Sequence, residues 1–350
     1  MKPQTYFAGG NTAGGFYTCF EHILPREKRK RMYYLKGGPG VGKSTLMRRV
    51  GLAAERAGER VEYFRCSSDP DSLDGVCLPD RGMAMMDGTA PHVYDPAVPG
   101  ARDTLLSLGD FLDEEALRPH ARSILRIQEA ISSCFLRCYR YLAAAEQVYR
   151  AAATGAEDPR RVRELAQAWA KEMPLRGGAG VVRYLFASAY TPKGYVEAQA
   201  FPEGARRTTV ECPFGLHATR LLRAVAEHAA ARGLNVVVLL DPLCPGDVVH
   251  VSLPEHGLVY SSGQRAQAQE GEWVEASRVF DLETVHKREQ GFDRNACELL
   301  TQRGVEQLTA AKALHDELEG YYAGNMDFLK WRAMLDRVLE EQGLEEAPDA

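Results

Sequence analysis

The chain has 350 residues, of which 45% are apolar, and carries a formal net charge of −5. This length suits two domains of about 150 to 200 residues, and the acidic balance argues against a protein built around non-specific nucleic-acid binding. Met1–Gly15 lacks the apolar region of a secretory signal, and no stretch approaches the roughly 20 apolar residues that span a membrane. We therefore expect a cytoplasmic protein without a membrane partner, in which the eight scattered cysteines are reduced.

A glycine-rich loop lies between a predicted strand and a predicted helix. Met32–Lys36 is a short apolar strand pattern, and Leu46–Ala57 has the apolar spacing of a helix that ends at Gly58. Between them, Gly37–Thr45 matches the G-x-x-x-x-G-K-[ST] pattern of a phosphate-binding loop (P-loop). The flanking strand and helix are the context that this pattern requires.

Each residue type of this loop has a role in holding phosphate. Glycines let the backbone direct several N–H groups inward, and the helix that follows points its positive dipole end at the same anion. Lys43 would reach the β- and γ-phosphates, and the Ser44 hydroxyl would ligate Mg2+. The expected cofactors are ATP and Mg2+, and the expected binding residues are Gly37, Gly38, Pro39, Gly40, Val41, Gly42, Lys43, Ser44 and Thr45.

A carboxylate for the magnesium ion is expected at the end of a neighbouring strand. The apolar run Met83–Met86 ends in Asp87. We expect Asp87 to bind Mg2+ together with Ser44 and to serve catalysis with Lys43, although an aspartate before glycine is also a common turn former. Val236–Asp241 shows the same pattern, but the repeat described below assigns it to a different strand.

Three further aspartates follow the predicted strand Val61–Cys66. Asp69, Asp71 and Asp74 lie in a run rich in Ser, Pro and Gly, and the carboxyl ends of strands in this kind of fold face the nucleotide. Asp69 and Asp74 are therefore candidate catalytic residues that would position a water molecule or an acceptor hydroxyl. The alternative is that they only form a loop. His92, in a later loop, is a candidate sensor of the terminal phosphate.

Helical spacing of apolar residues closes both halves of the chain. The predicted helices are Arg118–Arg150, Leu300–Tyr322 and, near the end of the chain, Met326–Glu341. Apolar periodicity lapses in Pro174–Gly180, where glycines cluster. We therefore predict a first domain over residues 1–176 and a second over residues 181–350.

The two halves are related in sequence. When Gly40–Gly88 is laid over Gly215–Gly263 without a gap, about a quarter of the positions are identical, several times the chance level. Upstream, Phe7 corresponds to Phe186. The prediction is an α/β fold of two P-loop NTPase-like modules. Each module would have a parallel sheet flanked by helices and would be followed by a helical segment.

The phosphate-binding residues are not kept in the second copy. Cys212 stands in place of Gly37, His217 in place of Gly42, Ala218 in place of Lys43 and Ser262 in place of Asp87. Only Thr219, which stands in place of Ser44, would keep its role. We therefore expect one nucleotide per chain.

Two related modules on one chain can pack about a pseudo-twofold axis, as homodimers do. We expect such an intramolecular pseudo-dimer, in which Arg220 or Arg223 would approach the phosphates of the first module. Two independent domains joined by Gly177–Gly180 are the alternative.

With these residues identified, the chain resembles a bacterial family of tandem P-loop ATPases of uncharacterised role. The similar stretches are Phe7–Thr12, Lys36–Leu46, Cys66–Asp69, Leu73–Gly75 and Asp87–His92. Members of that family usually carry a P-loop in both modules, and this chain departs from them at Cys212–Thr219. The resemblance implies ATP binding and a duplicated fold, and it implies no substrate beyond ATP.

Three classes of function agree with the sequence. The first is an ATPase whose hydrolysis of Mg-ATP drives a conformational or regulatory change. The second is a nucleotide-gated interaction protein with little turnover, and the third is a small-molecule or nucleotide kinase. The guanine-reading Asn-Lys-x-Asp motif, the Leu-Ser-Gly-Gly transporter signature and an arginine-dense lid are all absent from the sequence. The ATPase is therefore ranked first.

Overall fold

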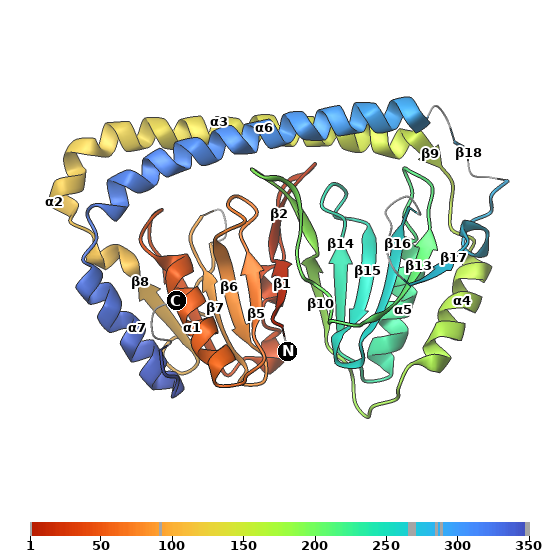
Figure 1. Ribbon diagram of the computed structural model, residues 1–350, viewed down its shortest axis with the longest axis horizontal. Helices are drawn as coiled ribbons and strands as arrows, with labels where there is room; N and C mark the ends of the chain where they lie inside the picture. The colour runs from red at the N-terminus through yellow and green to blue at the C-terminus, as the bar shows by residue number, and fades with distance from the viewer. Residues whose placement is uncertain (1, 91–92, 265–270, 284–285, 288–289, 347–350) are drawn as a thin grey trace.

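The computed structural model describes residues 2–90, 93–264, 271–283, 286–287 and 290–346. Its centre is one 12-stranded sheet, with two long helices lying across the ends of the strands (Figure 1). The strand order is β17-β13-β16-β15-β14-β10-β1-β5-β6-β7-β4-β8. The protein is therefore an α/β protein, as predicted, although one continuous sheet replaces the two that the sequence suggested.

Each half of the chain contributes one side of this sheet. The first half supplies β1 (Gln4–Phe7), β5 (Glu62–Arg65), β6 (Leu73–Leu78), β7 (Met83–Asp87), β4 (Arg31–Lys36) and β8 (Asp103–Ser107). The second half supplies β10 (Val182–Phe186), β14 (Val236–Leu240), β15 (Val248–Leu253), β16 (Leu258–Gly263), β13 (Arg206–Glu211) and β17 (Glu272–Val274). Read outward from the centre, the two lists give the strands in the order in which they lie in the sheet.

Most strands run in the same direction within their half. The exceptions among the described residues are β6 and β15, which pair antiparallel with both neighbours. The connections that flank these two strands are too short for a parallel crossover, which needs a dozen or more residues. The expected parallel sheets are thus one mostly parallel sheet in which β6 and β15 run antiparallel. β1 and β10 meet at the single pair Phe7 and Phe186.

Short elements complete the chain. The hairpins are β2 (Gly9–Thr12) with β3 (Gly15–Thr18), and β11 (Ser188–Thr191) with β12 (Gly194–Glu197), while β9 (Ala153–Thr154) pairs with β18 (His286–Lys287). The 3-10 helices are η1 (Phe20–His22), η2 (Arg26–Lys28), η3 (Leu108–Phe111), η4 (Arg118–His120), η5 (Pro254–His256) and η6 (Ala276–Arg278). The α-helices are α1 (Lys43–Arg56), α2 (Glu114–Leu117), α3 (Ala121–Ala152), α4 (Pro159–Glu172), α5 (Thr219–Ala231), α6 (Gln290–Ala323) and α7 (Phe328–Gln342).

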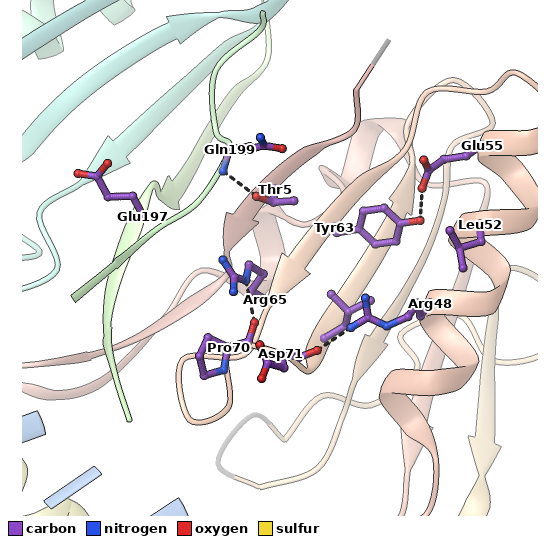
Figure 2. Close-up of a pocket in the computed structure, with 11 residues that line it drawn as sticks. Thr5, Arg48, Leu52, Glu55, Tyr63, Arg65, Pro70, Asp71, Glu197 and Gln199 are labelled. Carbon is purple, nitrogen blue, oxygen red and sulfur yellow. Dashed lines mark hydrogen bonds between the residues drawn. The ribbon is translucent and has the colours of Figure 1, made fainter. Parts of the chain in front are cut away.

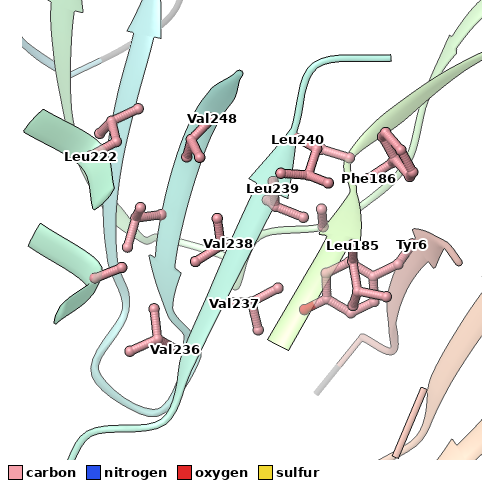
Figure 3. Packing of buried hydrophobic residues seen from close by; sticks show 14 of the residues in the cluster. Tyr6, Leu185, Phe186, Leu222, Val236, Val237, Val238, Leu239, Leu240 and Val248 are labelled. Atoms are coloured by element: carbon pink, nitrogen blue, oxygen red, sulfur yellow. The ribbon is translucent and has the colours of Figure 1, made fainter. Parts of the chain in front are cut away.

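The core around β14 shows why a continuous apolar run becomes a central strand. All residues of Val236–Leu240 are buried. Figure 3 shows this strand between Val248 of β15 and Leu185 and Phe186 of β10. A strand covered on both faces needs no polar side, so its sequence does not alternate.

The last helix of each half packs on the opposite half of the sheet. Trp331, Leu335 and Val338 of α7 join the core that contains Leu46 and Val50 of α1. In the second half, α4 packs against α5, and the Trp169 ring stacks on Tyr260 with centroids 4.9 Å apart. The predicted domains, residues 1–176 and 181–350, therefore exchange helices: α4 of the first packs in the second, and α7 of the second packs in the first.

The two long helices connect these exchanged parts. α3 and α6 lie side by side across the ends of the strands (Figure 1). Leu142 of α3 packs against Gly304 of α6, where a Cβ would lie 3.2 Å from the leucine side chain. At the other end of the pair, Ile124 and Ile127 cluster with Leu318.

A buried ion pair joins the halves at the centre of the sheet. The guanidinium of Arg183 lies 2.8 Å from the carboxylate of Glu62. Arg183 also donates to the carbonyl oxygens of His22, at 2.8 Å, and Ile23, at 3.0 Å. The charge is therefore satisfied on several sides, which a buried arginine requires.

No helix in the described part of the chain combines the length and the apolar character that crossing a membrane requires. The eight cysteines are all free.

Candidate functional site

The glycine loop, Gly37–Thr45, joins the end of β4 to the start of α1. Its backbone is left-handed at Gly40, with φ of 70°, and at Gly42, with φ of 84°. A side chain at Gly42 would be strained, and its Cβ would lie 2.7 Å from Nε1 of Trp331. Glycine is thus required there by both the backbone and the neighbouring ring.

Lys43 is folded back into the glycine loop. Its Nζ donates to the carbonyl oxygens of Gly37, at 2.7 Å, and Gly38, at 2.8 Å. The same atom lies 3.6 Å from Oδ2 of Asp87, and the two side chains are only 13% and 15% exposed. The loop therefore holds a largely buried cation, and a buried charge needs such partners.

Asp87 reaches this lysine because β7 and β4 are parallel neighbours. The register places Asp87 opposite Leu35, just before the glycine loop. Its Oδ1 accepts hydrogen bonds from the backbone N–H of Thr89, at 2.8 Å, and from the Thr89 hydroxyl, which leaves Oδ2 facing Lys43. His92, the suggested phosphate sensor, lies outside the described residues.

A second carboxylate stands at the same edge because β6 is antiparallel and starts where β7 ends. The N–H of Leu73 donates to Oγ of Ser44 at 2.9 Å, and Asp74 follows, only 4% exposed. Burial and then the charge of Asp87 raise the pKa of Asp74 to about 7. Its Oδ2 has no hydrogen-bond partner among the described residues.

Ser44, Asp74 and Asp87 thus lie in one neighbourhood: Ser44 accepts a hydrogen bond from the residue before Asp74, and Asp87 lies beside the Lys43 ammonium. Oxygen ligands are those that Mg2+ prefers, and a buried carboxylate oxygen without a partner is a position that a cation or its water would satisfy. The residues therefore fit a magnesium site, in which Asp74 joins the two ligands expected from the sequence.

The other two aspartates of this segment have different surroundings. Oδ2 of Asp69 lies 3.4 Å from Nζ of Lys312 on α6, and the negative charge of Asp69 also raises the pKa of Asp74. Asp71 is exposed and pairs with Lys193. Asp69 therefore belongs to the neighbourhood of Asp74, whereas Asp71 faces solvent.

A cavity of about 560 Å3 lies next to α1 (Figure 2). Its walls are Thr5, Arg48, Leu52, Glu55, Tyr63, Arg65, Pro70, Asp71, Leu73, Glu197 and Gln199. No residue of the glycine loop lines it, but its wall residue Leu73 bonds to Ser44. The cavity is thus adjacent to the carboxylate cluster and separate from the loop.

The second half of the chain supplies a wall of the glycine loop. A Cβ on Gly38 would meet the Tyr322 ring at 3.2 Å, and one on Gly40 would meet the carbonyl oxygen of Glu319 at 3.1 Å. Both residues belong to the C-terminal part of α6, and Trp331 of α7 continues the wall. The contact predicted between the halves at this loop therefore involves α6 and α7.

The arginines named from the sequence for that role are engaged elsewhere. Arg223 donates to the carbonyl oxygen of Gly246, at 2.8 Å, within its own half. The backbone N–H of Arg220 is bonded to Glu157. The suggestion that one of them approaches the phosphates of the first loop is not supported, because α5 and α1 lie on opposite sides of β1 and β10 (Figure 1).

In the second loop, Cys212–Thr219, the side chain of His217 contacts three side chains from outside the loop. Nε2 of His217 lies 2.9 Å from the hydroxyl of Tyr149 and 3.5 Å from Oδ2 of Asp241. Nδ1 of the same ring lies 3.4 Å from Oγ of Ser262. A tyrosine, an aspartate and a serine therefore bind the imidazole that replaces Gly42.

A protein carboxylate also occupies the helix end that follows the second loop. Glu157, 7% exposed, accepts hydrogen bonds from the N–H groups of Arg220, at 2.7 Å, and Leu221, at 2.8 Å. These N–H groups belong to the first turn of α5, where an anion is favoured by the helix dipole. The anion that is favoured at this helix end is therefore supplied by the chain itself.

Sequence reasoning did not identify Glu157, Lys312, Tyr322 or Trp331. They reach the two loops through the exchanged helices, and long-range packing leaves no local spacing signal. The sequence signal that could have indicated these contacts is the match of Gly40 with Gly215. Each glycine lies against a long helix: a Cβ on Gly215 would meet the backbone of Tyr149 and Ala153, and one on Gly40 would meet Glu319 and Ala323.

Comparison of the chain with family models, with curated proteins and with solved structures finds no match. The function is therefore inferred from the residues of the chain itself.

The buried carboxyl of Asp74 gives a testable pH dependence in magnesium-free buffer. Its folded pKa, about 7, lies above the unfolded value of about 3.9. The stability that its protonated form contributes is therefore complete below pH 4 and is lost as the pH rises through 7. The free energy of unfolding of Asp74→Asn, relative to wild type, should grow between pH 5 and pH 7 by up to about 1.4 kcal/mol per pH unit.

Denaturant unfolding at a series of pH values measures this difference. Asp71→Asn changes an exposed aspartate of the same segment and should show no such growth. A difference for Asp74→Asn that is constant from pH 5 to pH 8 would contradict the assigned environment.

Proposed function

We propose that the chain is an ATPase that binds one Mg-ATP at the glycine loop and uses its hydrolysis for a conformational or regulatory change. The observation that carries this proposal is the position of Lys43, buried between the carbonyl oxygens of Gly37 and Gly38 and the carboxylate of Asp87. A lysine held this way is a counter-charge ready for phosphate oxygens. The resemblance to tandem P-loop ATPases agrees with it, and we propose membership of that family.

The roles of the residues follow from their positions. Backbone N–H groups of the glycine loop and the N-terminal end of α1 would hold phosphate oxygens. Lys43 would leave its two carbonyl partners and bind the β- and γ-phosphates. Ser44, Asp74 and Asp87 would hold Mg2+, which neutralises phosphate charge when bound. Asp69 would orient the attacking water.

The second loop would serve no nucleotide of its own. Its phosphate-binding residues are replaced, and Glu157 already accepts hydrogen bonds from the N–H groups of the first turn of α5. We propose that the halves are related modules arranged as a pseudo-dimer. Two observations support this: the strand order is the same outward from β1 and β10, and equivalent helix ends pack on Gly40 and Gly215.

A kinase is the second candidate, and the cavity of about 560 Å3 favours it. Its two arginines, Arg48 and Arg65, would suit an anionic acceptor beside the carboxylate cluster. Release of phosphate from Mg-ATP by the protein alone supports the ATPase. Transfer of the phosphoryl group to an added acceptor supports the kinase. Binding without either reaction would indicate a nucleotide-gated switch.

We place this activity in the cytoplasm. ATP and Mg2+ are the proposed ligands, and the eight free cysteines agree with a compartment that keeps thiols reduced.

Mg-ATP should raise the thermal midpoint of the wild-type protein. A ligand that binds only the folded state at 100 times its Kd stabilises that state by about 2.7 kcal/mol. Lys43→Ala should lose most of the rise, and Lys330→Ala, which changes an exposed lysine of α7, should keep it. Thermal unfolding of the three proteins with and without Mg-ATP checks this. Equal rises in wild type and Lys43→Ala would place the nucleotide elsewhere.

The number of nucleotides per chain should be one. Glu157 already accepts the hydrogen bonds of the first turn of α5, and Ala218 offers no charge where the first loop has Lys43. Titration calorimetry with a non-hydrolysable ATP analogue and Mg2+ measures the stoichiometry directly. A value near two would show that the second loop binds nucleotide despite these replacements.

A further inference from the structure

We propose that Lys312, carried by α6 from the second half of the chain, contacts the terminal phosphate of the bound nucleotide and makes the site select triphosphate over diphosphate. The proposal rests on the proposed function of the glycine loop and adds a residue to that site.

The first observation is which face of α6 meets the loop. Tyr322 lies against Gly38 and Glu319 lies against Gly40, and the spacing of Lys312, His315, Glu319 and Tyr322 places these residues on one face of the helix. Two turns separate Glu319 from Lys312, about 10 Å along the helix. Lys312 therefore extends the surface that already covers the loop toward the carboxylate cluster.

The second observation is where the Lys312 ammonium lies. Its Nζ is 3.4 Å from Oδ2 of Asp69 and also contacts Asp316 of its own helix. The negative charge of Asp69 raises the pKa of Asp74, which the charges of Asp87 and Lys43 also shift. The ammonium thus lies at the side of the site that is formed by Asp69.

The third observation is the balance of charge. Asp69, Asp74 and Asp87 bring three carboxylates to this region, and Lys43 is the cation that the loop itself supplies. A terminal phosphate would add further negative charge beside Asp69. Lys312 is only 25% exposed and already faces that side, so a small movement of its flexible side chain would exchange a carboxylate for a phosphate oxygen.

This arrangement predicts a selective effect. Lys43 would contact the β-phosphate in both ADP and ATP, whereas Lys312 would gain a partner only when the terminal phosphate is present. The second half of the chain would then report, through α6, which nucleotide is bound.

The test is titration calorimetry of the full chain with Mg-ADP and with a magnesium-bound, non-hydrolysable ATP analogue. Lys312→Ala should weaken binding of the analogue by about tenfold or more, the scale of a hydrogen bond to a charged group, and change ADP binding by less than about threefold. Lys312→Arg keeps the charge and should retain most of the preference. Arg303→Ala removes another cation of α6 that pairs within its own helix, and it should change neither affinity.

Equal affinities of wild type and Lys312→Ala for the analogue would overturn the assignment, as would equal losses for both nucleotides. The thermal midpoint of each variant without nucleotide should lie within a few degrees of that of wild type. A change in affinity then comes from the binding site and not from loss of folding. If wild type binds neither nucleotide, the proposed function of the loop fails and this assignment fails with it. If wild type binds nucleotide and the Lys312 variants bind it equally well, the role of Lys312 fails while the proposed function of the loop stands.

Discussion

The exchange of helices between the two halves is the constraint on which the rest of the structure depends. α7, the last helix of the chain, covers the core beside α1, and α4, from the first half, covers α5. The long pair of α3 and α6 makes this crossing possible and brings each carboxyl-terminal helix end to the opposite loop. Without the exchange, the glycine loop would lose the wall formed by Glu319, Tyr322 and Trp331, and neither half would have a complete core.

The two loops meet the same physical requirement in different ways. A helix N-terminus favours an anion, and α5 receives one from Glu157 of the chain itself. Among the described residues, no carboxylate accepts a hydrogen bond from the first turn of α1, whose first residue is Lys43. The second loop is satisfied internally, so we propose that it supports the structure of the chain and leaves binding to the first.

Local patterns were enough to predict the strands and helices that build the glycine loop. The apolar runs that end at Lys36 and Asp87 became β4 and β7, because short buried strands need little beyond their own side chains. Asp74 was among the candidates named from the sequence, but the strand that carries it was read as part of a loop, since Leu73–Gly75 has turn-forming neighbours. Lys312 and Glu157 were not foreseen, because their positions depend on packing between segments far apart in sequence.

If the glycine loop receives the phosphates of Mg-ATP, a crystal structure of the protein with Mg2+ and a non-hydrolysable ATP analogue will show them there. Phosphates should be enclosed by Gly37–Ser44, with Nζ of Lys43 moved from the carbonyl oxygens of Gly37 and Gly38 onto phosphate oxygens. The contact between Glu157 and α5 should be unchanged. An analogue bound elsewhere, with Lys43 still bonded to the carbonyl oxygens of Gly37 and Gly38, would contradict this role of the loop.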